Sequence, residues 1–287
     1  MNTSFCATIA GIGFRFVSEF PMETPAELLP FPLQSGAAEE VFTLSAITEP
    51  LIFDTPPLFV STRLNIYRTA EGIAREFHAI HSTDGCKAVC VLREDRQNRL
   101  LLPQGILDRF QKNCTLSVLL GAEAIFLRHD ALLLHSSVVI YQGKAVLFCG
   151  APGIGKSTQA ALWAKTLGAE IINGDRCVIA RRADAFYGCG SPYCGSSGIL
   201  SNKEAPIGAI LLLGQSLENR LRRLSMSEAF RRILRELTVN AWDSAFMERC
   251  LSLLTNLVQA VPVYELQCRP DETAVMLAKE EITKHEL

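Results

Sequence analysis

The sequence predicts a mixed α/β fold in two parts, a β-rich region over residues 1–112 and a region of strands and helices over residues 113–287. Three observations indicate this. Runs of alternating apolar and polar residues recur in the first part, as half-buried strands require. Two amphipathic helical stretches lie in the second part. Strand patterns there do not alternate regularly with helices as in a doubly wound sheet, so a mixed sheet is expected.

The N-terminal region is expected to consist of short strands joined by polar connectors. Residues 95–98, Asp-Arg-Gln-Asn, have the composition of a hairpin turn. Residues 21–50 contain several prolines and little periodicity, which favours a loop with at most a short helix. The predicted strands cover residues 7–17, 64–68, 74–80 and 88–92.

The C-terminal region contains clearer turn and helix-capping signals between its predicted elements. Gln142-Gly143 between two apolar runs is typical of a hairpin, and Ser225 with Glu228 fits a capping box at a helix start. A turn is expected at residues 173–176. The predicted helices cover residues 116–128, 157–167, 227–237, 245–259 and 271–279, and the predicted strands cover 132–141, 145–149, 171–172, 177–180, 209–213 and 263–268.

Composition excludes several classes of protein. The net charge of −2 carries no signature of nucleic-acid binding, and no apolar run approaches the length of a membrane span, so we expect neither nucleic acid nor membrane as a partner. The first residues lack a basic segment and are expected to form a strand rather than a signal peptide, which favours a cytoplasmic location.

The ten cysteines do not predict a disulfide framework. Cys149 and Cys177 lie within apolar runs, where a thiol behaves as a small hydrophobic group. The pairs 86/90 and 189/194 lack the usual two-residue spacing of zinc ligands, so a metal–thiolate site is not expected either.

Residues 150–158, Gly-Ala-Pro-Gly-Ile-Gly-Lys-Ser-Thr, match the G-x-x-x-x-G-K-S pattern of a phosphate-binding loop. The expected strand before it and helix after it supply the context that this motif needs. Its glycines allow backbone N–H groups and the helix N-terminus to face phosphate oxygens. Lys156 is placed to reach the β- and γ-phosphates, and Ser157 to ligate Mg²⁺. The predicted nucleotide-binding residues are Gly150, Gly153, Ile154, Gly155, Lys156, Ser157 and Thr158.

Residues 134–182 resemble the catalytic domain of HPr serine kinase/phosphorylase, a P-loop family related to PEP carboxykinase. His135 precedes Gly150 by fifteen residues, which is the spacing in that family. The sequence Asn173-Gly-Asp-Arg176 falls where the family has two adjacent aspartates. The N-terminal half is similar to the front ends of short HPr-kinase-like proteins found beside peptide-modification genes.

The resemblance implies an HPr-kinase-like P-loop domain that transfers the γ-phosphoryl group of ATP, with Mg²⁺, to a hydroxyl. The acceptor it implies is a serine in a peptide or small protein, and the assembly it implies is a homo-oligomer. Asp175 then acts as catalytic base or as a metal ligand beside Ser157. His135 either orients Asp175 or carries positive charge. Arg176, the next residue, is either a cation that neutralises phosphate charge or a surface residue.

One position departs from the family pattern. Gly174 stands where the first aspartate of the family is expected to take the proton from the attacking serine. Asp175 must therefore serve as base, as metal ligand, or as neither. A nucleotide-binding switch or accessory protein for a peptide-modifying system is the alternative. A carboxykinase-like enzyme acting on a small acid is a second alternative, although no cluster of metal-binding side chains supports it.

Several further residues keep two interpretations open. His135 lies in an apolar run and could equally be a hydrogen-bonded core residue. Residues 190–198, with Ser196 and Ser197, either form a mobile loop over the phosphates or an ordinary Gly/Ser-rich loop. The basic run Arg220, Arg222 and Arg223 is either a solvated face or a strip that docks an acidic peptide. Trp163 and Trp242 are expected in the core or at an interface.

Overall fold

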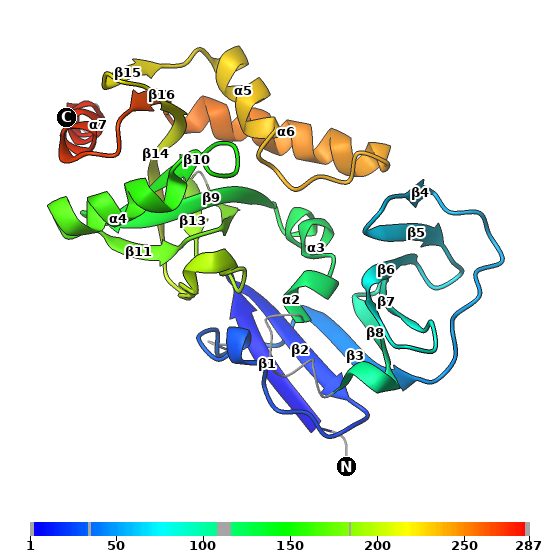
Figure 1. The fold of residues 1–287 in the computed structure, drawn as a ribbon. Helices are drawn as coiled ribbons and strands as arrows, with labels where there is room; N and C mark the ends of the chain where they lie inside the picture. The colour runs from blue at the N-terminus through cyan, green and yellow to red at the C-terminus, as the bar shows by residue number, and fades with distance from the viewer. Residues whose placement is uncertain (1–2, 34–35, 108–115, 184, 285–287) are drawn as a thin grey trace. The chain divides into compact units, whose positions relative to one another are not determined.

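The computed structural model describes residues 3–33, 36–107, 116–183 and 185–284, and its ribbon is shown in Figure 1. The chain divides into two compact units, Met1–Ala122 and Glu123–Leu287. The boundary expected at residues 112–113 lies outside the described residues.

The N-terminal unit is built on an eight-stranded mixed sheet in the order β1-β2-β3-β8-β7-β6-β5-β4. In this sheet β3 pairs in parallel with both β2 and β8, and the other strand pairings are antiparallel. The strands predicted over 64–68, 74–80 and 88–92 are confirmed. The bounds are β1 Thr3–Ile9, β2 Ile12–Ser18, β3 Glu40–Ile47, β4 Phe59–Val60, β5 Leu64–Arg68, β6 Ile73–His81, β7 Lys87–Leu92 and β8 Gln97–Pro103, with 3-10 helices at Ala26–Leu28 and Gln104–Ile106.

Two predictions for this unit are wrong. The run 7–17 is not one strand, because Ala10 and Gly11 both have positive φ (51° and 80°) and turn the chain back as a hairpin between β1 and β2. The region 21–50 is not all loop, because β3 lies between β2 and β8 in the sheet. The first residue of β3, Glu40, is fully buried and accepts a hydrogen bond from Asn98 Nδ2 at 2.8 Å.

The helix predicted over 116–128 is interrupted. It forms α2, Leu116–Leu119, and α3, Ala122–Arg128. Gly121 between them has φ +60°, and a Cβ there would lie 2.9 Å from the guanidinium of the buried Arg75. The left-handed backbone at Gly121 ends the first helix, as glycine commonly does at a helix C-terminus.

The C-terminal unit is built on a second eight-stranded sheet in the order β10-β9-β12-β13-β14-β16-β15, with β11 also paired to β9. Because β10 also pairs with β14, the five strands β10, β9, β12, β13 and β14 form a closed ring in which each strand pairs with the next. The mixed sheet predicted for this half is confirmed. The strand bounds are β9 Ala131–Tyr141, β10 Lys144–Cys149, β11 Glu170–Asn173, β12 Arg176–Arg182, β13 Ala185–Cys189, β14 Glu204–Gln215, β15 Arg220–Arg223 and β16 Val263–Cys268.

Helices cover the second sheet on two sides, around two separate apolar clusters (Figure 1). The helices α4 (Lys156–Leu167) and α7 (Glu272–Lys284) contact one another and share one cluster with Phe148 and Trp163. The helices α5 (Met226–Leu234) and α6 (Ser244–Ala260) share the other cluster. Trp163 is fully buried against Phe148, with ring centroids 5.7 Å apart, so it is a core residue, whereas Trp242 is half-buried.

The hairpin of β9 and β10 is confirmed, with Gln142 (φ 48°) and Gly143 (φ 76°) as the two turn residues. The capping box of Ser225 and Glu228 at the start of α5 is confirmed as well. The turn expected at residues 173–176 is present as a two-residue bend, Gly174 and Asp175, between β11 and β12. Both β11 and β12 pair antiparallel with β9, so the chain bends there and continues in the same direction.

The basic run forms most of the short strand β15, whose one strand partner among the described residues is β16. Arg220 pairs with Glu218, and Arg222 lies 3.0 Å from Glu228 and 3.1 Å from Glu265. The cations at 220 and 222 are therefore balanced by carboxylates of the same unit. Across the described part of the chain no helix is both long and apolar enough to span a bilayer, and the nine cysteines described there carry free thiols.

Candidate functional site

The phosphate-binding motif lies between the end of β10 at Cys149 and the start of α4 at Lys156. Gly150, Gly153 and Gly155 all have positive φ, at 140°, 79° and 114°. A Cβ at Gly150 would lie 3.2 Å from Ile154 Cγ2, so the loop is tightly folded there. Because β10 runs parallel to β14, the loop stands at the carboxyl edge of two adjacent parallel strands, where α/β folds place ligands.

Lys156 is the first residue of α4, and its side chain is buried. Its Nζ donates hydrogen bonds to the carbonyl oxygens of Gly150 (2.7 Å) and Ala151 (3.2 Å). Burial lowers the pKa of the Lys156 ammonium, while the charges of Glu236 and Asp175 act in the opposite direction. The cation therefore lies over the loop and within electrostatic reach of both acids.

The remaining residues of the motif divide into two kinds. Ser157 and Thr158 are exposed in the first turn of α4, and neither hydroxyl makes a hydrogen bond to any described residue. Ile154 packs instead against the apolar cluster shared by α4 and α7, and its N–H donates to Ala151 O at 3.2 Å. The serine and threonine hydroxyls are thus available to a ligand, whereas the Ile154 side chain stabilises the loop.

Asp175 is presented by the bend between β11 and β12, which the buried Asn173 holds in shape. Asn173 Oδ1 accepts from the N–H groups of Asp175 (2.9 Å) and Arg176 (2.8 Å). Asn173 Nδ2 donates to the carbonyls of Ser191 and Tyr193, both at 3.2 Å. The Asn-Gly-Asp sequence indicates this role of Asn173, because an Asn side chain in a turn commonly forms a hydrogen bond with the backbone two residues onward.

His135 and Asp175, which the sequence analysis singled out together, lie in contact. In the pairing of β9 with β12, His135 stands opposite Arg176. His135 Nε2 lies 3.3 Å from Asp175 Oδ1. This hydrogen bond lowers the pKa of the Asp175 carboxyl, burial opposes it, and the charges of His135, Arg176 and Lys156 lower it further. The site therefore stabilises the ionised carboxylate.

Two residues of the site were missed in the sequence analysis, and both follow α5. Glu236 Oε2 lies 4.0 Å from His135 Nδ1, and its side chain is only 17% exposed. Thr238 Oγ1 accepts a hydrogen bond from Arg176 Nη1 at 2.5 Å, while Arg176 Nε lies 3.9 Å from Asp175 Oδ2. No local pattern in the sequence indicates these contacts, which join residues about sixty to one hundred positions apart.

The bend is also covered by the loop of residues 195–197, a single 3-10 turn. A Cβ at Gly174 would clash with the side chain of Ser197, coming within 2.6 Å of its Cβ. A Cβ at Gly195 would lie 2.7 Å from Asp175 Cβ. Ser197 Oγ donates to Cys194 O at 2.7 Å, so its hydroxyl is used within the loop. The Ser196 side chain lies outside the described residues.

The residues present fit Mg²⁺ bound together with phosphates. No set of three or more His, Cys, Asp and Glu side chains in the described ranges is arranged to hold a metal ion by itself. Magnesium, however, usually takes one or two carboxylates, and its other ligands are waters and substrate phosphates. The free hydroxyl of Ser157 and the ionised carboxylate of Asp175 are oxygen ligands of the required kind.

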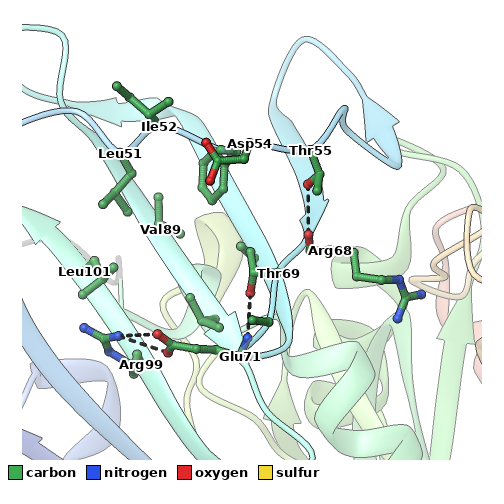
Figure 2. A pocket seen from close by; sticks show the side chains of 14 residues that line it. Leu51, Ile52, Asp54, Thr55, Arg68, Thr69, Glu71, Val89, Arg99 and Leu101 are labelled. Carbon is green, nitrogen blue, oxygen red and sulfur yellow. Dashed lines mark hydrogen bonds and ion pairs between the residues drawn. The ribbon is translucent and has the colours of Figure 1, made fainter.

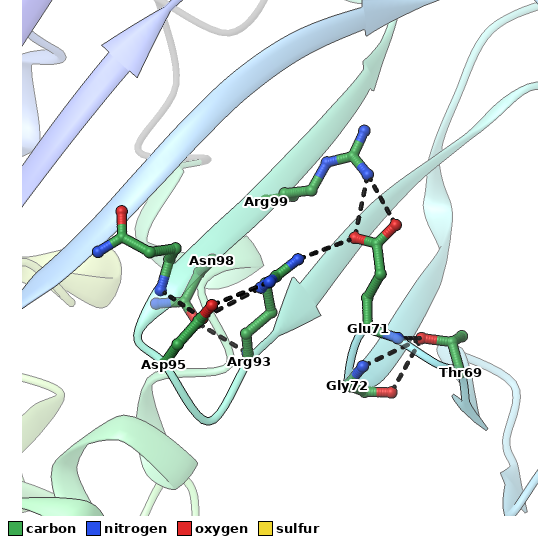
Figure 3. A network of polar contacts seen from close by, with 8 residues as sticks. Thr69, Glu71, Gly72, Arg93, Asp95, Asn98 and Arg99 are labelled. Carbon is green, nitrogen blue, oxygen red and sulfur yellow. Dashed lines mark hydrogen bonds and ion pairs between the residues drawn. The ribbon is translucent and has the colours of Figure 1, made fainter.

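The N-terminal unit contains a separate hollow of about 600 Å³ (Figure 2). Its floor is formed by the apolar side chains of Ala74, Val89, Val91 and Leu101, and residues 51–55 form one wall. At its rim Glu71 accepts two hydrogen bonds from Arg99 Nη1, at 3.1 and 3.0 Å. Figure 3 shows that Glu71 also bonds Arg93, which bonds Asp95 in turn. The charges of this network balance one another.

No protein-family model matches the chain, and no curated protein matches it. Among solved structures, the HPr(Ser) kinase/phosphatase from Coxiella burnetii is similar at 11% identity, over 54% of this chain and 99% of that one, with a TM-score of 0.33. The likeness is a distant structural relationship. By its own fold and site the chain is a mixed α/β protein with the strand–loop–helix geometry of a phosphate-binding loop.

Proposed function

We propose that the chain is a Mg²⁺–ATP-dependent kinase that transfers the γ-phosphoryl group to a hydroxyl, specifically to a serine of a peptide or small protein. The observation that carries this proposal is the ionised Asp175, held by His135 and within electrostatic reach of the P-loop Lys156. A carboxylate beside a phosphate-binding lysine supplies the base and the cation that phosphoryl transfer to a hydroxyl requires.

In this mechanism the loop backbone and Lys156 hold the triphosphate, and the Lys156 ammonium exchanges its bonds to Gly150 and Ala151 for phosphate oxygens. Ser157 is the oxygen ligand available to Mg²⁺, which when bound would neutralise charge on the β- and γ-phosphates, and Asp175 is assigned the role of base rather than that of a second metal ligand. The acceptor oxygen forms a bond to the γ-phosphorus as the bond to the bridging oxygen breaks and ADP leaves. The hydroxyl proton passes to Asp175, and Arg176 offsets charge on the transferring group.

The decisive experiment is incubation of the protein with γ-labelled ATP, Mg²⁺ and short peptides encoded beside its gene. Label on a serine of one peptide supports the kinase. Competition by unlabelled ATP, GTP and pyrophosphate identifies the donor. Label transfer that survives Asp175→Asn at the full rate overturns the assignment of the base.

A nucleotide-binding switch or accessory protein is the second candidate, and Gly174 favours it. The bend carries one carboxylate where the resembled family has two, and Ser197 fills the space beside Gly174. Tight, Mg²⁺-dependent ATP binding with no label transfer and no hydrolysis in the same assay supports this reading over the kinase.

A further inference from the structure

Residues 236–238, between α5 and α6, lie along the first half of β9 as a short extended segment. His135 N donates to Glu236 O and Thr238 N donates to Leu133 O, both at 2.9 Å. Leu134 and Leu237 face one another as an isolated antiparallel bridge. Backbone pairing therefore fixes this segment to the strand that carries His135.

In an extended segment, alternate side chains point to the same side. Leu237 is buried in the apolar cluster beneath α5 and α6. Its neighbours Glu236 and Thr238 point the other way, onto the site. Thr238 Oγ1 accepts from Arg176 Nη1, and the Glu236 carboxylate faces His135 Nδ1. One segment thus contacts two of the three residues to which catalysis is assigned.

The contact with Thr238 matters for Arg176 in particular. The Arg176 side chain is 36% exposed, and its Nε lies 3.9 Å from Asp175 Oδ2, beyond hydrogen-bond distance. The bond to Thr238 is the shorter of these two contacts by more than 1 Å. An arginine side chain loses much rotamer freedom when it is held in one place, so a single strong anchor determines where its charge lies.

We infer that Thr238 is a positioning residue: its hydroxyl holds the Arg176 guanidinium beside Asp175, where the charge of the transferring phosphoryl group develops. The inference rests on the proposed function for its kinetic consequence, but the contact itself does not depend on that function. A threonine that acts only through an arginine has no effect once the arginine is removed.

The kinetic test compares Thr238→Val, which keeps the shape and removes the acceptor oxygen, with Thr238→Ser, which keeps the oxygen. Misplaced catalytic groups cost about 10- to 100-fold in rate, so we expect kcat to fall about tenfold in the valine variant with KM for ATP unchanged. The serine variant is expected to recover to within about threefold of the original kcat. In an Arg176→Ala background, Thr238→Val is expected to have no further effect.

The matched control is Thr255→Val, which removes a hydroxyl that donates to Leu251 O (2.8 Å) within α6. Unchanged kcat in Thr238→Val, equal losses in the serine and valine variants, or a full additional loss in the Arg176→Ala background would each overturn the inference.

A second readout needs neither acceptor nor ATP. The ¹H–¹⁵N signals of the Arg176 side chain, assigned by their loss in Arg176→Ala, report how freely the guanidinium rotates. We expect restrained rotation in the original protein, Thr238→Ser and Thr255→Val, and free averaging in Thr238→Val. Averaging that is identical in all four proteins contradicts the inference. Restraint lost only in Thr238→Val, in a protein that transfers no phosphoryl group, supports the positioning contact and rejects the kinase.

Discussion

His135 Nε2 lies 3.3 Å from Asp175 Oδ1, so a residue of β9 and a residue of the β11–β12 bend form one polar pair, within electrostatic reach of Lys156. The pairing register produces this contact, because β12 enters the sheet with Arg176 opposite His135. The residue just before β12 then projects from the strand end toward the imidazole. The hydrogen bonds that the backbone N–H groups of Asp175 and Arg176 donate to Asn173 Oδ1 keep Asp175 there.

Replacement of Asp175 by Asn removes the negative charge but keeps the shape of the side chain. General-base catalysis contributes about 10²- to 10⁴-fold, so we expect kcat for phosphoryl transfer to fall by that factor while ATP affinity changes severalfold at most. Steady-state assays and nucleotide titration measure the two effects separately. The matched control is Asp130→Asn, an exposed acid paired with Arg249 in the same unit. Equal losses in both variants contradict a specific role for Asp175.

Replacement of Lys156 by Ala removes the cation of the loop and is expected to abolish measurable ATP binding, a loss of at least about 100-fold. The variant removes the buried Lys156 ammonium, which is the positive charge proposed to bind the β- and γ-phosphates. Lys165→Ala is a control on the same helix, because Lys165 is exposed and pairs with Glu272 at 3.0 Å. Isothermal titration with ATP and Mg²⁺ gives the affinities, and an unchanged affinity in Lys156→Ala refutes the loop assignment.

Local sequence signals predicted those elements of the C-terminal unit that depend on a few adjacent residues. The Gln142-Gly143 hairpin, the Ser225 capping box, and the strand and helix that flank the loop motif each have such a signal and form as predicted, whereas nucleotide binding by the loop stays a prediction. The roles of His135, Asp175 and Arg176 stay predictions, because contact does not establish catalysis. Their proximity, however, follows from strand pairing that the sequence does not display.

The errors have the same physical origin. The Asn-Gly-Asp sequence predicted the turn but not the direction of the chain after it, which is set by the pairing of both flanking segments with β9. Glu236 and Thr238 reach the site from an irregular segment with no periodicity, fixed by two backbone bonds to β9. Ala10 and Gly11 divide an apolar run whose sequence pattern is that of one strand. The hairpin is formed by their left-handed backbone, which the residue pattern does not indicate.

The capping box of α5 predicts a pH dependence. Glu228 accepts from Ser225 N and Ser225 Oγ and pairs with Arg222, which together lower the pKa of its carboxyl from 4.5 to about 2. Because the folded-state pKa is depressed, this stabilisation is complete above about pH 4.5 and is lost as the pH falls toward 2. We expect the urea midpoints of the original protein and Glu228→Gln to differ at pH 6 and to converge toward about pH 2.5. A difference that stays constant contradicts the assignment.

Asn173→Ala tests the support beneath Asp175. The side chain is fully buried and bonds five neighbouring groups, so its removal leaves several buried polar groups without partners. We expect a loss of about 2–4 kcal/mol in the free energy of unfolding. Urea denaturation measures this loss. Asn219→Ala is the control, because Asn219 is only half-buried and makes fewer side-chain bonds, with Asp271, Thr273 and Arg269. A loss below about 0.5 kcal/mol in Asn173→Ala contradicts a supporting role.

Gly174→Asp tests why the bend carries a single carboxylate. Any side chain at this position meets Ser197, whose Cβ would lie 2.6 Å from the new Cβ, although the Gly174 backbone itself is not in the left-handed region. The obstacle is therefore the covering loop, and overpacking of this kind costs about 1–3 kcal/mol. We expect Gly174→Asp alone to lower the free energy of unfolding by that amount, and the double variant with Ser197→Gly to recover most of it.

Ser197→Gly alone is the control for the loop. If the double variant is as unstable as Gly174→Asp, the steric account is wrong. If the double variant is stable and its phosphoryl transfer exceeds that of Ser197→Gly, a second carboxylate at the bend increases activity.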